Sequence, residues 1–146
     1  MSSTGLDVFD KTLQTTNIWL DEIMQTLGPE RNVAWHVLGA VIRALRDRLP
    51  AELSAHLSAQ LPLLVRGAYY DRYRPGHGIA PLHTDDDFLH HVAEDLGGIR
   101  PVNVRKATQS VFAVLVHHVT PEQVEKVKAS LPASIRALWP EHGAAM

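Results

Sequence analysis

Hydrophobic residues recur every three or four positions along most of this chain, which is the spacing of a helix that buries one face. The first such stripe predicts a helix over residues 7–27 and consists of Phe9, Leu13, Thr16, Leu20, Ile23 and Leu27. Similar stripes predict helices over residues 30–49, 51–60 and 62–69. After a segment rich in proline and glycine, further helices are expected to begin near residues 84, 101, 120 and 132. The pattern therefore predicts an all-α protein.

A nine-residue motif occurs twice. Residues 61–69 and residues 131–139 both read Leu-Pro, two variable residues, a β-branched residue, Arg, two variable residues and an aromatic residue. The two copies lie 70 positions apart, and further matches precede them at nearly the same offset, such as Trp19 with Phe88. Self-similarity at a fixed offset indicates a repeated supersecondary unit.

The duplication predicts how the chain is divided. We expect a first helical repeat over residues 1–75, a linker over residues 76–83 and a second repeat over residues 84–146, with about four helices in each repeat. Short helices are marginal in water without tertiary packing, and a unit of roughly 70 residues buries little surface on its own. The two pseudo-repeats are therefore expected to pack into one helical bundle. Its largest core side chains are expected to be Trp19, Tyr69, Phe88, Phe112 and Trp139.

The segment 110–116 is ambiguous when it is taken alone. Its sequence, Ser-Val-Phe-Ala-Val-Leu-Val, is rich in β-branched residues and would suit a buried strand. Its counterpart in the first repeat, around Val41 to Leu45, has a clear helical pattern. We therefore predict a helix for this segment as well.

Composition limits the function. Of 146 residues, 45% are hydrophobic and 21% are charged, with a formal net charge of −2, as in an ordinary soluble globular protein. The chain lacks the basic excess of a nucleic-acid or membrane-surface protein, so neither partner is expected. There is no cysteine, which excludes disulfides and thiolate metal sites. Neither a signal peptide nor an apolar run of roughly 20 residues is present, so we expect a cytoplasmic protein.

A cluster of arginine and tyrosine residues marks the junction between the repeats. Arg66, Tyr70, Arg72, Tyr73 and Arg74 lie on the helix that begins at residue 62 and on the segment that follows it. Arginine and tyrosine commonly anchor protein interfaces, so these five residues are the predicted partner-binding surface. The alternative is structural: Arg66 would bond to helix carbonyls or pair with a carboxylate of the first helix, and the other side chains would cover the junction.

Histidine and aspartate suggest a second kind of site. The chain has nine histidines, and Asp86 precedes His90 by four residues, as Asp87 precedes His91. Side chains four positions apart on a helix lie on the same face, and His with Asp would suit zinc or iron. The alternative is a solvated helix face, because the first repeat has no such histidines.

Catalytic motifs are weak. The run Asp85–Asp87 could supply a general acid and base, but carboxylates also favour the start of a helix. Gly76 and Gly78 lack the spacing of a phosphate-binding loop. The charges of Arg43, Arg46 and Arg48 are offset by Asp47 and Glu52, so we expect a solvated face rather than a nucleic-acid surface.

Several of these segments together resemble the bacterial domain of unknown function 2267 family. They are Phe9-Asp10-Lys11-Thr12-Leu13 with Trp19-Leu20, the Leu61-Pro62 motif through Tyr70, and the Leu131-Pro132 motif through Trp139. The resemblance covers nearly the whole chain. It implies an all-helical, internally duplicated fold, and it implies no activity, cofactor or catalytic residue.

The sequence favours a protein-binding or assembly module without catalysis or a cofactor, which would act on an unknown protein partner or by self-association. The alternative is a metal- or small-ligand-binding helical protein that uses the His/Asp cluster of the second half. An enzyme with its site between the repeats is a third hypothesis.

Overall fold

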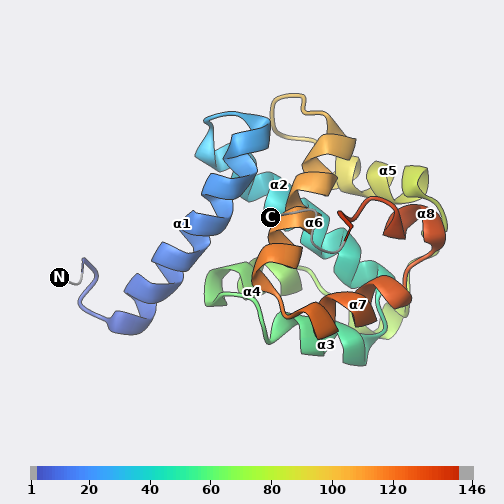
Figure 1. Cartoon of the computed structure of the whole chain (residues 1–146), viewed down its shortest axis with the longest axis horizontal. Helices are drawn as coiled ribbons and strands as arrows, with labels where there is room; N and C mark the ends of the chain where they lie inside the picture. The colour runs from blue at the N-terminus through green and yellow to red at the C-terminus, as the bar shows by residue number, and fades with distance from the viewer. Residues whose placement is uncertain (1–2, 142–146) are drawn as a thin grey trace.

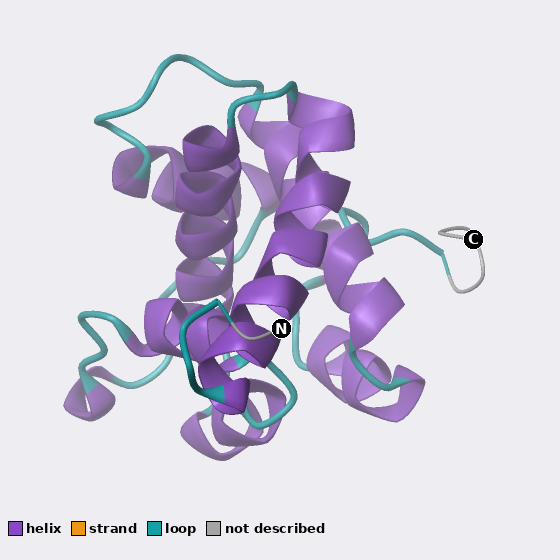
Figure 2. Ribbon diagram, turned by 90° about the vertical axis from the view of Figure 1, so that its left-hand side faces the viewer, coloured by secondary structure: helices purple, strands orange, loops and turns teal. Residues whose placement is uncertain are grey.

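A computed structural model describes residues 3–141, and this part of the chain is helical without any strand (Figures 1 and 2). The all-α prediction is confirmed. The α-helices are α1 (Asp7–Leu27), α2 (Arg31–Arg48), α3 (Ala51–Ser58), α4 (Leu63–Tyr70), α5 (Asp85–Asp95), α6 (Val104–His118), α7 (Pro121–Ala129) and α8 (Ala133–Arg136). One 3₁₀ turn, η1 (Pro75–His77), lies between α4 and α5. The predicted repeats also include residues 1–2 and 142–146, which lie outside the described residues.

Local sequence sets several helix ends. Gly28 ends α1 with a positive φ of 105°, a conformation that costs glycine little. Thr84 starts α5 with a capping box, in which its hydroxyl accepts the backbone N–H of Asp87 and the Asp87 carboxylate accepts the backbone N–H of Thr84. The ambiguous segment 110–116 lies inside α6, so the prediction of a helix there is confirmed.

Helix α2 forms the centre of the bundle. It packs against α1, α4, α5 and α6, and its residues Val37, Leu38, Val41 and Leu45 are fully buried. The five predicted core aromatic residues are all buried, which confirms that prediction. The Phe112 ring stacks on Trp139 at 4.1 Å between centroids and lies 5.8 Å from the Phe88 ring.

The two halves contact each other in reciprocal pairs. Helix α1 of the first half packs against α6 of the second, and α5 of the second half packs against α2 of the first. Helices α3 and α7 also lie together, as Figure 1 shows. Reciprocal contacts of this kind are what two equivalent units produce when they pair about a two-fold axis.

The repeated arginine makes the same contacts in both halves. Arg66 donates from Nε to the carbonyl of Ser58 at 3.0 Å and from Nη2 to the carbonyl of Leu61 at 3.1 Å. Arg136 bonds in the same way to the carbonyls 70 positions further along the chain, at 3.1 and 2.8 Å. Equivalence of the halves stays a prediction, and these matching bonds support it.

Helix α1 differs from the prediction in its first half. Thr16, Leu20 and Ile23 of its stripe are buried, but Phe9 is 48% exposed and Leu13 is 41% exposed. In Figure 1 this end of α1 projects away from the other helices. At the offset of the Trp19–Phe88 match, the first residue of α5 corresponds to Thr16, so residues 7–15 have no α-helical counterpart among the described residues that follow α4.

Candidate functional site

Three of the five predicted partner-binding residues, Arg66, Tyr70 and Tyr73, contact other residues of the bundle around α4. The side chain of Arg66 bonds to carbonyls, as the structural alternative proposed. The half-buried Tyr70 donates its hydroxyl to Ser58 Oγ at 3.2 Å. Its ring lies 5.4 Å from that of Tyr73, which is also half-buried. The other two, Arg72 and Arg74, are exposed.

A buried arginine holds the end of α4. Arg46 is only 6% exposed, and its Nη1 donates to the carbonyls of Tyr69 at 2.8 Å and Asp71 at 2.7 Å. Carbonyls at a helix end have no partner within the helix, and a guanidinium offers five N–H donors. The prediction of a solvated face is therefore wrong for Arg46, because α4 packs across it. Its Nε and Nη2 also donate to Asp47 at 3.0 and 2.8 Å.

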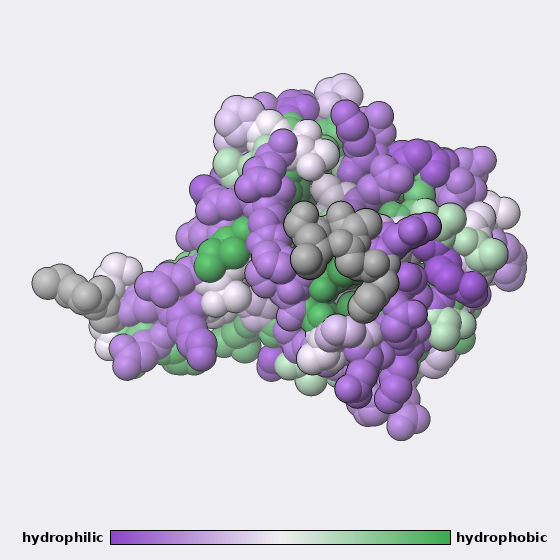
Figure 3. Space-filling model, in the orientation of Figure 1, coloured by the Kyte–Doolittle hydropathy of each residue, from purple (hydrophilic) through white to green (hydrophobic). Residues whose placement is uncertain are grey.

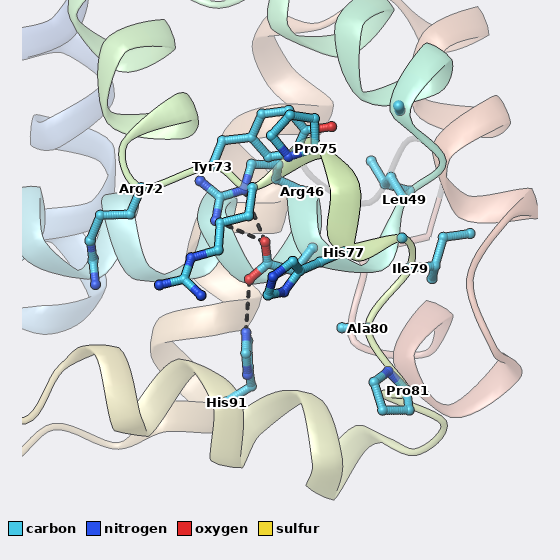
Figure 4. Close-up of a pocket in the computed structure, with 14 residues that line it drawn as sticks. Arg46, Leu49, Arg72, Tyr73, Pro75, His77, Ile79, Ala80, Pro81 and His91 are labelled. Carbon is cyan, nitrogen blue, oxygen red and sulfur yellow. Dashed lines mark hydrogen bonds and ion pairs between the residues drawn. The ribbon is translucent and has the colours of Figure 1, made fainter.

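This chain of contacts continues to α5. Asp47 lies 2.9 Å from His91 Nε2, as the dashed lines of Figure 4 show. Burial tends to raise the pKa of the Asp47 carboxyl, but hydrogen bonds from His91 and Arg46 outweigh burial and lower that pKa below 3.8. The hydrogen bond to Asp47 raises the pKa of His91 above 6.5. Arg46, Asp47 and His91 thus form a chain of ion pairs that connects α2 of the first half to α5 of the second.

The raised His91 pKa predicts a pH-dependent stability. A histidine whose pKa is higher in the folded state contributes full stability below its unfolded pKa, and this contribution is lost as pH rises through the folded pKa. Asp47 behaves oppositely, because its pKa is lowered: its contribution is complete above the unfolded pKa, near 3.8, and is lost only as pH falls through the folded pKa. We expect wild-type protein to lose up to about 1 kcal/mol as pH rises above 6.5, since the pair is partly exposed.

Urea denaturation at a pH below 6.5 and at one well above it would measure this loss. His91→Gln removes the titrating group and should show a flatter profile than wild type. His90→Gln is the control, because the His90 side chain is 79% exposed and its one ion-pair contact within residues 3–141 is with Glu94, at 3.9 Å. Equal profiles for wild type and His91→Gln would contradict the predicted linkage.

A cavity of about 360 Å³ opens beside this cluster, between the end of α2 and the linker. Its lining includes Arg46, Tyr73, Arg74 and His77 (Figure 4). The guanidinium of Arg74 makes no hydrogen bond or ion pair with any residue of the described part. Arg72 has a φ of 60°, the one non-glycine residue with positive φ in the described backbone, and it pairs with Asp95 at 3.0 Å.

The four predicted metal ligands have separate partners. The Asp87 carboxylate accepts backbone N–H groups at the start of α5. Asp86 is exposed, at 3.8 Å from Arg105, while His90 lies near Glu94 and His91 bonds to Asp47. Within residues 3–141, no three of the four approach one another closely enough to share an ion.

A different group does converge, on the contact between α1 and α6. Glu22 Oε1 lies 2.9 Å from His117 Nδ1, and Glu22 Oε2 lies 2.7 Å from His118 Nε2. The two histidines are adjacent in sequence, but Glu22 lies 95 and 96 residues earlier. The sequence draws attention to this histidine pair through the high histidine count. It gives no sign of the partner Glu22, which reaches the pair only because the two halves pack together.

Exposed hydrophobic side chains concentrate at the start of α1 and at the start of α4, a region which we call the apolar strip. It comprises Leu6, Val8, Phe9, Leu13, Leu63 and Leu64. Among the described residues, large hydrophobic side chains are otherwise exposed only at Ile18 and Ile79. Figure 3 shows hydrophobic surface along the projecting end of α1, beside hydrophilic residues. A groove of about 370 Å³ between α1 and α4 adjoins the strip.

The model of a conserved protein family described as uncharacterised, DUF2267, matches residues 16–138. The chain belongs to this family. The match confirms the resemblance noted from the sequence motifs, and it begins at Thr16, after the exposed Phe9 and Leu13. No curated protein matches the chain. None of the described helices of this DUF2267 protein combines the length and the apolar character that crossing a membrane requires.

In this DUF2267 protein the aspartates 85–87 form the first turn of α5, where Asp85 and Asp87 accept hydrogen bonds. Hydrogen bonding to Arg105 lowers the pKa of Asp85, and backbone N–H groups, first that of His83, lower the pKa of Asp87. A general acid at neutral pH needs a raised carboxyl pKa. Asp85 and Asp87 are therefore poorly suited to that role, and the electrostatics favour the structural alternative.

Proposed function

We propose that this DUF2267 protein is an assembly module without catalysis of its own, and that a second copy of the chain binds the apolar strip. The observation that carries the proposal is the exposed apolar end of α1. An amphipathic helix gains stability by burying its apolar face, at about 25 cal/mol per Å² removed from water. Phe9 and Leu13 continue the buried stripe of α1, but within residues 3–141 they stay 48% and 41% exposed.

The apolar strip and the groove beside it have complementary shapes, one projecting and one concave. The end of α1 offers a projecting apolar helix, while Val8, Trp19 and Leu63 line the groove beside it. A surface that carries both features can pair with itself, because each copy inserts its helix into the groove of the other. Self-association therefore requires no second kind of surface.

Charge also favours a second copy. The first turn of α1 carries Asp7 and Asp10, and the groove is lined by Lys11 and Arg66. When two copies exchange helices, the acidic turn of each approaches the basic groove of the other. Opposite charges at the rim of an interface favour association and set its orientation.

Sedimentation velocity over a range of concentrations tests this proposal. We expect a reversible dimer, and Phe9→Asp should raise its dissociation constant by at least about 30-fold, the size expected for an interface hot spot. Ile18→Asp is the matched control. Ile18 is 51% exposed against 48% for Phe9, and it lies nine positions, or two and a half turns, away on the opposite side of α1.

Two results would overturn the proposal: a wild-type chain that stays monomeric at every concentration, or equal weakening by Phe9→Asp and Ile18→Asp. Arg74→Glu separates the strip from the predicted Tyr/Arg surface. If the dimer forms through that surface instead, Arg74→Glu will weaken it and Phe9→Asp will not.

A further inference from the structure

We propose that Glu22, His117 and His118 bind one divalent transition-metal ion between α1 and α6, with Zn²⁺ as the preferred probe. The site is distinct from the Asp86, Asp87, His90 and His91 set considered above. It does not depend on self-association, because all three ligands come from one chain.

The geometry suits an ion. One carboxylate oxygen and two imidazole nitrogens lie within 4.8 Å of one another. Ligand atoms around a tetrahedral Zn²⁺ with bonds of about 2.0–2.1 Å are separated by roughly 3.3 Å. The present N···O distances are 2.9 Å from His117 Nδ1 to Glu22 Oε1 and 2.7 Å from His118 Nε2 to Glu22 Oε2, so binding requires each nitrogen to move away from its oxygen by roughly 0.5 Å.

The donor set selects the class of metal. Two imidazoles with one carboxylate suit Zn²⁺, Fe²⁺, Co²⁺ or Ni²⁺, while Mg²⁺ and Ca²⁺ prefer oxygen ligands alone. Three protein ligands leave at least one coordination position for water. His117 is 60% exposed, so solvent reaches the cluster from its side.

The surrounding structure holds the ligands in place. The His118 ring stacks on the buried ring of Trp19, at 5.2 Å between centroids. Trp19 lies three residues before Glu22, so both side chains lie on the same part of α1. Helix α6 ends at His118, and the negative end of its dipole favours a cation there.

The same contacts also satisfy a simpler arrangement, in which Glu22 accepts a hydrogen bond from each imidazole and no ion is bound. The two arrangements differ in what Zn²⁺ does. A metal that binds the folded chain raises its melting temperature in proportion to the logarithm of metal concentration, whereas a hydrogen-bonded cluster gives no such dependence.

Calorimetric titration of chelator-treated, tag-free protein with ZnCl₂, together with melting curves, tests the site. We expect one ion per chain and a melting temperature that rises with Zn²⁺. Glu22→Gln and His118→Ala should each weaken binding by at least about tenfold. Co²⁺ should give visible absorption bands of nitrogen and oxygen coordination in wild type, and these should disappear in both variants.

His90→Ala and His91→Ala are the controls, and both should bind Zn²⁺ as wild type does. Circular dichroism confirms that each variant is folded before titration. The proposal fails if wild type binds no Zn²⁺, if Glu22→Gln and His118→Ala bind as wild type does, or if either control variant loses binding. Loss of binding in a control variant would instead indicate that the His/Asp cluster of α5 binds the metal.

Discussion

Replacing Arg46 with alanine is expected to lower the free energy of unfolding by about 3–5 kcal/mol, the cost of removing one partner from a buried ion pair. The substitution leaves two carbonyls at the end of α4 without their donor. It also leaves the carboxylate of Asp47 with His91 as its one remaining partner among the described side chains. Urea denaturation followed by circular dichroism would measure the change.

Arg74→Ala is the control for this loss, since Arg74 is exposed and its guanidinium bonds to no described residue. We expect a change within about 0.5 kcal/mol there. Arg46→Lys keeps the charge but not the forked geometry, and should recover only part of the loss. Full recovery by lysine would show that charge alone, and not the bonds to the α4 carbonyls, supports the fold.

Replacing Phe112 with alanine is expected to cost about 3–5 kcal/mol as well, because the change opens a cavity in a core that cannot fully collapse. Phe112 is fully buried between the rings of Phe88 and Trp139. It comes from α6, which packs against α1, α2 and α5, and both of its ring partners belong to the second half, so the cavity would open in the core of that half.

The same substitution at Phe9 provides the comparison. Phe9 is 48% exposed on the projecting end of α1, and Phe9→Ala should change the stability of the monomer by less than about 1 kcal/mol. Both variants must be compared below the concentration at which copies associate. Similar losses at Phe112 and Phe9 would mean that the shared core is not organised as described.

Much of the fold follows from local patterns. The proline before α4 and the proline before α8 each precede the first residue of a helix, as their missing N–H and fixed φ favour. The glycine after α1 and the capping box of α5 act equally locally. Duplication also resolved the segment 110–116, whose own composition suited a strand.

The candidate sites were less predictable. Arg66 has the same local sequence context as Arg136, and so its bonds to carbonyls could be anticipated as an alternative. Arg46 could not be assigned in this way, since its partners are carbonyls 23 and 25 residues away and are supplied by the packing of α4. Side chains four apart on α5 share a face, but that spacing does not say whether another helix supplies a third ligand.

Periodicity, capping and hydrophobicity within short segments were enough to predict the helices, most of their ends and most of the core residues. The burial of one half of the α1 stripe and the contact of Glu22 with His117 and His118 could be learned from the packed helices alone. Both depend on where α1 lies relative to α4 and α6. That placement comes from the joint packing of many side chains, which no spacing along the chain encodes.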